Sequence, residues 1–287
     1  MSNVENQRVI LVTGANRGIG FFIVKKLVEE SSLTSTVILL GSRDLKRGDD
    51  ALIQLNSPSN VHVLQLDMSS RQSILQAIDQ IKQNYGGQVD VVINNAGITT
   101  SEITVNAARE IFNTNYYGTK FLNECIVPLM RQNGRIINVS SRVATRILED
   151  ASQSLQQKYT SPTLTEDQLE QLIEDFISAI DTNTLEHLGY DPQSTDLVYG
   201  VSKAALNALT QIEARQWSNT KNLLVVSVTP GLCATDMARH MPGARPPELG
   251  ATSVLYLVNT PRDELENGGF YRDGQRLPLI NQSVPKD

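Results

Sequence analysis

Short apolar runs alternate with helical stretches along most of the chain, and this alternation is the strongest constraint on its fold. The apolar runs lie at residues 9–12, 37–40, 61–66, 89–93, 135–139 and 223–228. The stretches with helical periodicity lie at residues 19–30, 45–55, 69–85 and 107–130. Runs this short and this apolar are typical of strands covered on both faces. The alternation predicts an α/β fold, a Rossmann-like doubly wound parallel sheet with helices on both faces.

Length and composition are compatible with one large domain. A chain of 287 residues, 40% of them hydrophobic, can bury a substantial core, so we predict a single domain over residues 1–287. No apolar run approaches the ~20 residues that span a bilayer, and the polar N-terminus lacks the apolar core of a signal peptide. The two cysteines, Cys125 and Cys233, show no metal-like spacing. We therefore expect a cytoplasmic protein with no membrane partner and no metal.

The charge of the chain is unevenly distributed. The net charge of −6 argues against a nucleic-acid partner. Eleven acidic residues and one lysine lie between residues 147 and 198, so the rest of the chain is mildly basic. A basic body suits an anionic ligand, although a solvated acidic face without any bearing on a ligand gives the same composition.

A glycine-rich turn, TGANRGIG at residues 13–20, joins the first predicted strand to the first predicted helix. Such a turn lets the backbone approach a phosphate and directs a helix N-terminus at its negative charge. The spacing is G-x3-G-x-G, so the commoner G-x-G-x-x-G fingerprint applies only in modified form. A tight turn with no ligand remains the alternative. The turn residues that we expect to contact a nucleotide are Gly14, Asn16, Arg17, Gly18, Ile19 and Gly20.

The residue after the second predicted strand indicates which dinucleotide is bound. An NAD site usually places an acid there, which binds the ribose 2′-hydroxyl. This chain has Arg43 there, and Arg17 lies within the glycine turn. Two guanidinium groups suit a 2′-phosphate, which each can grip with two hydrogen bonds. The pattern predicts NADPH (NADP) as cofactor, while the neighbouring Asp44 leaves NADH open.

Polar residues also follow the third and fourth predicted strands. Asp67 and Met68 come after the third, where Asp67 can accept from an adenine amino group, cap the helix beginning at residues 69–70, or do both. Asn95 lies in the stretch NNAG at residues 94–97 and can hold the sheet edge together or bind a ribose. We include Asp67, Met68 and Asn95 among the predicted cofactor contacts.

Hydroxyl and amine groups follow the fifth predicted strand. The strand ends in Ser140 and Ser141, and period-2 alternation turns only one of the two toward the ligand crevice. Tyr199 and Lys203 are four residues apart, so they share a helix face. An ammonium beside a phenol stabilises the phenolate, so we expect Lys203 to lower the pKa of Tyr199 toward neutrality.

Taken together, these motifs resemble the short-chain dehydrogenase/reductase family. The matching residues stand in the family's order over nearly the whole chain: the turn 13–20, Asp67, the stretch 94–97, Asn115, Ser141, Tyr199, Lys203, Pro230 and Gly231. Members of the family usually have a short link between the serine and the tyrosine. Here an insertion at about 145–198 separates them, which is similar to the monomeric NADPH-dependent carbonyl reductases. In that subgroup an inserted helix covers the surface that others use to oligomerise, so we expect a monomer.

The insertion itself shows helical patterning. Residues 165–168, TEDQ, match a capping box, and apolar residues then recur at helical spacing over residues 169–180. The insertion therefore carries at least one amphipathic helix.

The resemblance implies an enzyme that reduces ketones, aldehydes and quinones to alcohols by hydride transfer from NADPH. Tyr199 would be the general acid, Lys203 would lower its pKa and bind the nicotinamide ribose, and Ser141 would hydrogen-bond the carbonyl oxygen. Asn115 would hold a water that passes protons to Lys203. Pro230 and Thr235 would lie over the nicotinamide, followed by a substrate lid at residues 239–247. An alcohol or hydroxysteroid dehydrogenase and a non-catalytic dinucleotide-binding sensor remain alternatives.

Overall fold

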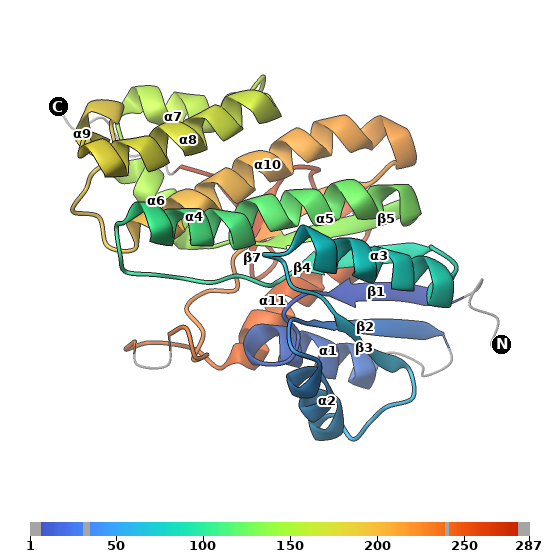
Figure 1. Cartoon of the computed structure of the whole chain (residues 1–287). Helices are drawn as coiled ribbons and strands as arrows, with labels where there is room; N and C mark the ends of the chain where they lie inside the picture. The colour runs from blue at the N-terminus through green and yellow to red at the C-terminus, as the bar shows by residue number, and fades with distance from the viewer. Residues whose placement is uncertain (1–6, 31–34, 239–240, 281–287) are drawn as a thin grey trace.

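The protein is organised around an eight-stranded sheet with strand order β3-β2-β1-β4-β5-β6-β7-β8 (Figure 1). The computed structural model describes residues 7–30, 35–238 and 241–280. The strands are β1 (Arg8–Val12), β2 (Thr36–Ser42), β3 (Val61–Gln65), β4 (Val89–Asn94), β5 (Met130–Val139), β6 (Leu224–Val228), β7 (Phe270–Arg272) and β8 (Gln275–Leu277). The pairings from β3 through to β7 are parallel, and β8 runs antiparallel to β7. The predicted doubly wound parallel sheet is confirmed.

Helices cover both faces of the sheet, as the apolar runs predict. The helices α1 (Gly18–Glu30), α2 (Leu45–Gln54) and α11 (Pro247–Asn259) lie on one face, and α3 (Arg71–Tyr85), α5 (Gly118–Ile126) and α10 (Leu197–Lys221) lie on the other (Figure 1). Strand β1 shows the alternation. Ile10 and Val12 belong to the apolar cluster that contains α1 and α11, while Leu11 belongs to the cluster that contains α3 and α5. Both faces of the central strands are therefore buried.

The last two strands were not predicted from the sequence. Strands β7 and β8 have three residues each, which is too short for a recognisable period. Their connection is a tight turn in which Asp273 and Gly274 have φ angles of 48° and 82°. Two consecutive left-handed residues are typical of the turn that joins hairpin strands directly.

The prediction of one helix over residues 107–130 is wrong in its middle and at its end. Helix α4 (Val105–Phe112) passes into a π-helical turn (Asn113–Tyr117) before α5 begins, and a short 3-10 turn (Val127–Leu129) leads into β5. The wider π-turn lies where Asn115 points inward to bind the backbone of Ile98. At Gly118 a Cβ atom would collide with the carbonyl oxygen of Met68, so only glycine allows this close approach.

The insertion before Tyr199 is helical and shares a core with the rest of the molecule. It contains α6 (Arg142–Asp150), α7 (Gln153–Tyr159), α8 (Glu166–Thr182) and α9 (Leu185–Leu188), which lie together beside α4 and α10 (Figure 1). The predicted capping box is present, with Thr165 and Gln168 bonding each other's backbone N–H groups. Phe176 is fully buried and packs edge-to-face against Phe112 of α4, with ring centroids 6.0 Å apart. The inserted helices therefore belong to the same apolar cluster as the helices of the sheet layer.

Replacing Phe176 with alanine tests whether the insertion and the sheet unfold as one unit. Truncation of a fully buried phenylalanine costs about 3–5 kcal/mol of unfolding free energy. We expect this loss to appear in one cooperative denaturant transition. The single tryptophan, Trp217 on α10, supplies a fluorescence signal that can be compared with circular dichroism.

The matched control is Ile53→Ala, because Ile53 on α2 is 67% exposed and its truncation should leave stability almost unchanged. A Trp217 transition that keeps its midpoint in Phe176→Ala, while the helical signal is lost earlier, would show that the insertion unfolds independently.

Candidate active site

A cavity of about 1160 Å³ lies along the carboxyl ends of the parallel strands. This is the edge at which ligands bind in open α/β sheets, because the strand order reverses there between β1 and β4. The predicted site residues that line it are Gly14, Asn16, Arg17, Gly18, Ile19, Arg43, Asp67, Met68, Asn95, Ser141, Tyr199, Lys203, Pro230 and Thr235. Two further predicted residues, Gly20 and Asn115, do not line it.

The glycine turn is held against the end of β4 by the side chain of Asn95. Its Nδ2 donates to the carbonyl oxygens of Thr13 at 2.9 Å and Gly14 at 3.1 Å. Gly14 and Gly18 have positive φ angles of 61° and 57°, which favour glycine. Gly20 lies behind the turn, where a Cβ atom would lie 2.5 Å from Asn95 Nδ2. Asn95 therefore has the first of its two predicted roles, and the N-terminus of α1 lies at the cavity.

Arginine side chains gather at the end of the cavity formed by the glycine turn and the loop after β2. Arg17, Arg43 and Arg47 all line the cavity there. Arg17 Nη1 lies 2.6 Å from Asp236 Oδ2 in an ion pair whose side chains are 61% and 45% exposed. Within the described residues Arg43 has no ion-pair partner. Asp44, the acid beside it, accepts from the Arg47 N–H and caps α2.

The helix-capping role predicted for Asp67 is wrong. The N-cap of α3 is Ser70, whose side chain accepts from the N–H of Ser73. Asp67 lies too far before the first turn of α3, and its Oδ1 instead accepts from the N–H of Ser69 at 2.9 Å and from its hydroxyl at 2.7 Å. The carboxylate still lines the cavity, next to Met68.

Ser141 and Tyr199 meet at the opposite end of the cavity. Ser141 follows β5 and caps α6, and its hydroxyl is near enough to Tyr199 to affect the pKa of the phenol. Its neighbour Ser140 turns the other way and donates to the carbonyl oxygen of Lys203 at 3.3 Å. Desolvation raises the pKa of Tyr199 to about 12, although the nearby Ser141 hydroxyl lowers it in part. Tyr199 is therefore a neutral phenol at physiological pH.

The prediction that Lys203 lowers the pKa of Tyr199 is not met. The Lys203 side chain is buried, and its Nζ donates to the carbonyl oxygen of Val139 at 2.8 Å. Nζ lies 5.9 Å from the centroid of the Tyr199 ring, so the ammonium does not offset the desolvation of the phenol. Burial also lowers the pKa of Lys203 to about 8. The pair therefore consists of a weak phenolic acid and an unusually acidic ammonium.

Asn115 lies behind the cavity wall in the π-helical turn. Its amide exchanges hydrogen bonds with the backbone of Ile98 at 2.9 and 3.0 Å and donates to Ser202 Oγ at 3.1 Å. A Cβ atom on Gly97 would lie 3.3 Å from both Asn115 Oδ1 and Lys203 Nζ, so both groups lie close to Gly97. Asn115 thus connects the loop after β4 to α10, one residue before Lys203.

The predicted lid is only partly described, because Arg239 and His240 lie outside the described residues. Met241 lines the cavity, and so do Leu232 and Met237, all three with exposed side chains. Sequence reasoning did not single out these apolar residues or Arg47, since no period or motif marks them. The only feature of the sequence that pointed to a lid was the proline- and glycine-rich composition of residues 239–247.

The cavity fits an elongated ligand that carries phosphate groups at one end. The glycine turn, the N-terminus of α1 and three arginines supply the donors that phosphates require. At the other end a hydroxyl, a phenol and an ammonium converge on one region.

Replacing Lys203 with methionine tests the cost of burying this ammonium. A pKa of about 8, against 10.5 for the ordinary lysine, corresponds to about 3 kcal/mol of lost stability near pH 7. The unfolded state binds more protons between these two values, so wild-type stability rises relative to the variant as the pH increases through this window.

We expect Lys203→Met to have a higher free energy of unfolding in urea than wild type near pH 7. The gain is reduced by the cost of leaving the buried Val139 carbonyl without its donor. The advantage should shrink or reverse by about pH 10.5. A variant equally destabilised at both pH values would contradict the buried cation.

Comparisons with known proteins agree with this geometry. Residues 8–152 match the family model of the short chain dehydrogenases. The chain is 36% identical to carbonyl reductase (NADPH) 3 of Rattus norvegicus, with 93% of this chain and 96% of that protein covered. It is 35% identical to carbonyl reductase (NADPH) 1 of Homo sapiens, with 89% and 92% covered.

Solved structures have the same fold. Salutaridine reductase from Papaver somniferum superposes with a TM-score of 0.80 at 27% identity, covering 92% of this chain and 99% of that one. The NADPH-bound carbonyl reductase from chicken fatty liver superposes with a TM-score of 0.67 at 23% identity, covering 92% and 96%. The motifs, the sheet topology and these similarities establish that the chain belongs to the short-chain dehydrogenase family.

Proposed function

We propose that this protein reduces carbonyl compounds, namely ketones, aldehydes and quinones, to alcohols with NADPH as the reductant. The observation that carries the proposal is that Ser141, the neutral phenol of Tyr199 and Lys203 line one cavity together. A neutral phenol has a proton to donate to a carbonyl oxygen. The relatives named carbonyl reductase (NADPH) support the same reaction.

The residues of the arginine end suit NADPH. Arg17 and Arg43 would hold the 2′-phosphate, the glycine turn would hold the pyrophosphate, and Asp67 and Met68 would lie against the adenine. When bound, NADPH supplies the hydride. Asp44 is engaged in capping α2, so its carboxylate is not free to bind a ribose 2′-hydroxyl, and this supports a 2′-phosphate beside Arg43.

The catalytic roles follow from the protonation states. Tyr199 donates its phenolic proton to the carbonyl oxygen, while the hydroxyl of Ser141 donates a hydrogen bond to that oxygen as negative charge develops. The phenolate left behind is a stronger base than the neutral Lys203 amine, because the pKa of Tyr199 is about 12 and that of Lys203 is about 8. Lys203, with a pKa of about 8, then returns a proton to Tyr199, and Asn115 keeps the α10 backbone in place beside it.

The protein is further proposed to act as a cytoplasmic monomer on small molecules. Helix α8 packs over α4 and α10, which supports the view that the insertion covers a surface otherwise open to a second subunit. Cys125 and Cys233 are both free thiols, which suits a reducing compartment. None of the helices in the described ranges is long and apolar enough to cross a bilayer.

The reaction is tested by following NADPH oxidation against a panel of quinones, aldehydes and ketones. We expect turnover by wild type and a loss of at least about a hundredfold in kcat for Tyr199→Phe, because general acid catalysis contributes that much or more. The affinity for NADPH, measured by fluorescence titration, should stay within about twofold, since the phenylalanine fills the same space.

NADPH binding without turnover of any carbonyl would favour the sensor alternative. Turnover only with alcohols and NADP would favour a dehydrogenase that works oxidatively. Substantial activity in Tyr199→Phe would remove Tyr199 as the acid.

The cofactor preference is tested with Arg43→Ala. Loss of a charge-assisted contact to the 2′-phosphate should raise the KM for NADPH about tenfold to a hundredfold and leave the KM for NADH almost unchanged. Lys46→Ala is the matched control, since Lys46 is exposed in the same region but does not line the cavity. Equal changes in the KM for NADPH and the KM for NADH would show that Arg43 does not bind the 2′-phosphate.

A further inference from the structure

The segment 230–237, here named the strap, crosses the cavity from its Tyr199 end to the glycine turn. It begins after β6, whose last residue, Val228, accepts a hydrogen bond from the N–H of Ser140 at the end of β5. At its far end Thr235 Cγ2 would lie 3.3 Å from a Cβ atom on Gly18, and Asp236 pairs with Arg17. Residues of the strap line the cavity over this whole span. The strap therefore borders the route by which any elongated ligand enters.

One arginine connects the start of the strap to the β7–β8 turn. Arg245 Nε donates to the carbonyl oxygen of Pro230 at 2.8 Å, and its Nη2 donates to the same oxygen. The two Nη atoms of Arg245 each lie 2.8 Å from one carboxylate oxygen of Asp273. We call these three residues, Pro230, Arg245 and Asp273, the clasp.

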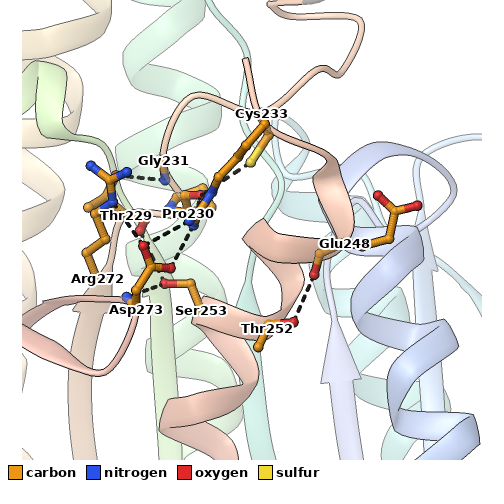
Figure 2. Close-up of polar contacts among 10 residues, drawn as sticks. Thr229, Pro230, Gly231, Cys233, Glu248, Thr252, Ser253, Arg272 and Asp273 are labelled. Carbon is orange, nitrogen blue, oxygen red and sulfur yellow. Dashed lines mark hydrogen bonds and ion pairs between the residues drawn. The ribbon is translucent and has the colours of Figure 1, made fainter. Parts of the chain in front are cut away.

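The clasp rests on rigid elements. Asp273 occupies the tight turn between β7 and β8, and its backbone N–H donates to Ser253 Oγ of α11 at 2.8 Å (Figure 2). Arg272 Nε donates to the Asp273 carboxylate at 3.2 Å. The Arg245 and Arg272 guanidinium groups hold the pKa of Asp273 below its usual range, so the clasp is ionised at physiological pH.

The backbone of Arg245 also binds the first half of the strap. Its N–H donates to the carbonyl oxygen of Leu232 at 2.8 Å, and its own carbonyl oxygen accepts from the N–H of Ala234 at 2.9 Å. Cys233, between them, donates its thiol to the carbonyl oxygen of Pro230 (Figure 2). The strap is thus held continuously from Pro230 to Ala234.

The far end of the strap also carries an ion pair, but one of different geometry. The side chain of Arg245 is 19% exposed and engages Asp273 through two parallel hydrogen bonds. The side chains of Arg17 and Asp236 are 61% and 45% exposed and meet through one short contact. The Asp273 side chain is 44% exposed, close to the 45% of Asp236, so the Arg245 pair is distinguished by its bidentate geometry and by its more buried guanidinium.

We propose that Arg245 is a positioning residue. Together with Asp273 it fixes the Pro230 end of the strap at the Tyr199 end of the cavity, so that the strap is held in place to close over the bound dinucleotide. The inference rests on the proposed function, since it takes NADPH as the ligand of the cavity. Loosening the clasp leaves a smaller fraction of molecules able to close, and the apparent dissociation constant rises in proportion.

The test compares Arg245→Ala, Arg245→Lys and Asp273→Asn with wild type. Dissociation constants are measured by titration for NADPH and for adenosine 2′,5′-bisphosphate, which carries only the groups expected at the Arg43 end. We expect Arg245→Ala to weaken NADPH about tenfold or more, as for loss of a charge-assisted bidentate contact, and to leave the fragment within about twofold. Arg245→Lys keeps the positive charge but cannot make the two parallel hydrogen bonds of a guanidinium, so its loss of NADPH affinity should be intermediate.

The matched control is Arg276→Ala, because Arg276 also lies on the β7–β8 hairpin. Its Nη2 pairs with Glu266 Oε1 at 2.7 Å, and the two side chains are 59% and 57% exposed. This substitution should change neither dissociation constant. The double variant Arg245→Ala/Asp273→Asn should lose no more NADPH affinity than Arg245→Ala alone, because both substitutions break one coupled unit.

Three outcomes would overturn the proposal: variants that bind NADPH as wild type does, equal losses for NADPH and for the fragment, or additive effects in the double variant. Failure of wild type to bind NADPH at all would instead refute the proposed function, and the role of the clasp would fall with it.

Discussion

The active site depends on one buried hydrogen bond, from the ammonium of Lys203 to the carbonyl oxygen of Val139. It ties α10 to the last residue of β5, directly before the serine pair. With this bond in place, Ser141 and Tyr199, which are far apart in the sequence, line the same cavity, and the Ser141 hydroxyl partly lowers the pKa of Tyr199. A buried cation is held only when it is well paired, and here it has one carbonyl partner and a lowered pKa. The site thus retains a charge that an apolar core would exclude.

A second set of buried polar contacts holds the same helix farther along. Asn94 of β4 donates to Asn123 of α5 and to Asn138 of β5, both at 2.8 Å. Asn138 in turn donates to Thr210, and Asn123 donates to Glu213, both on α10. Burial raises the pKa of Glu213 well above its usual range, which suits a neutral member of a hydrogen-bonded chain. This network sets the register of α10 against two strands, and Lys203 and Tyr199 share that register.

The polar groups at the two ends of the cavity differ in their exposure to solvent. At the glycine turn the contacts come from backbone groups and from exposed arginines, so their charge is available to a ligand from solution. At the Tyr199 end the titratable groups are desolvated, and their pKa values move in opposite directions, to about 12 for the phenol and about 8 for the ammonium. Desolvation disfavours the charged form of each, so the two pKa values, which are nearly equal in water, move apart. Proton transfer from the Lys203 ammonium to a Tyr199 phenolate is therefore more downhill than in water, and the reverse transfer is more uphill.

The sequence by itself indicated six parallel strands and the sheet edge at which the polar strand-end residues gather, because apolar runs report burial and strand-end residues share one edge of a parallel sheet. It also indicated the helix in the insertion through its capping box. It did not reveal the π-turn at Asn115, the capping of α3 by Ser70, or the pKa of Tyr199. Only the tertiary structure decided these, since each depends on distances between segments far apart in the chain. Spacing placed Tyr199 and Lys203 on one helix face, but the position of the Val139 carbonyl decided where the ammonium points.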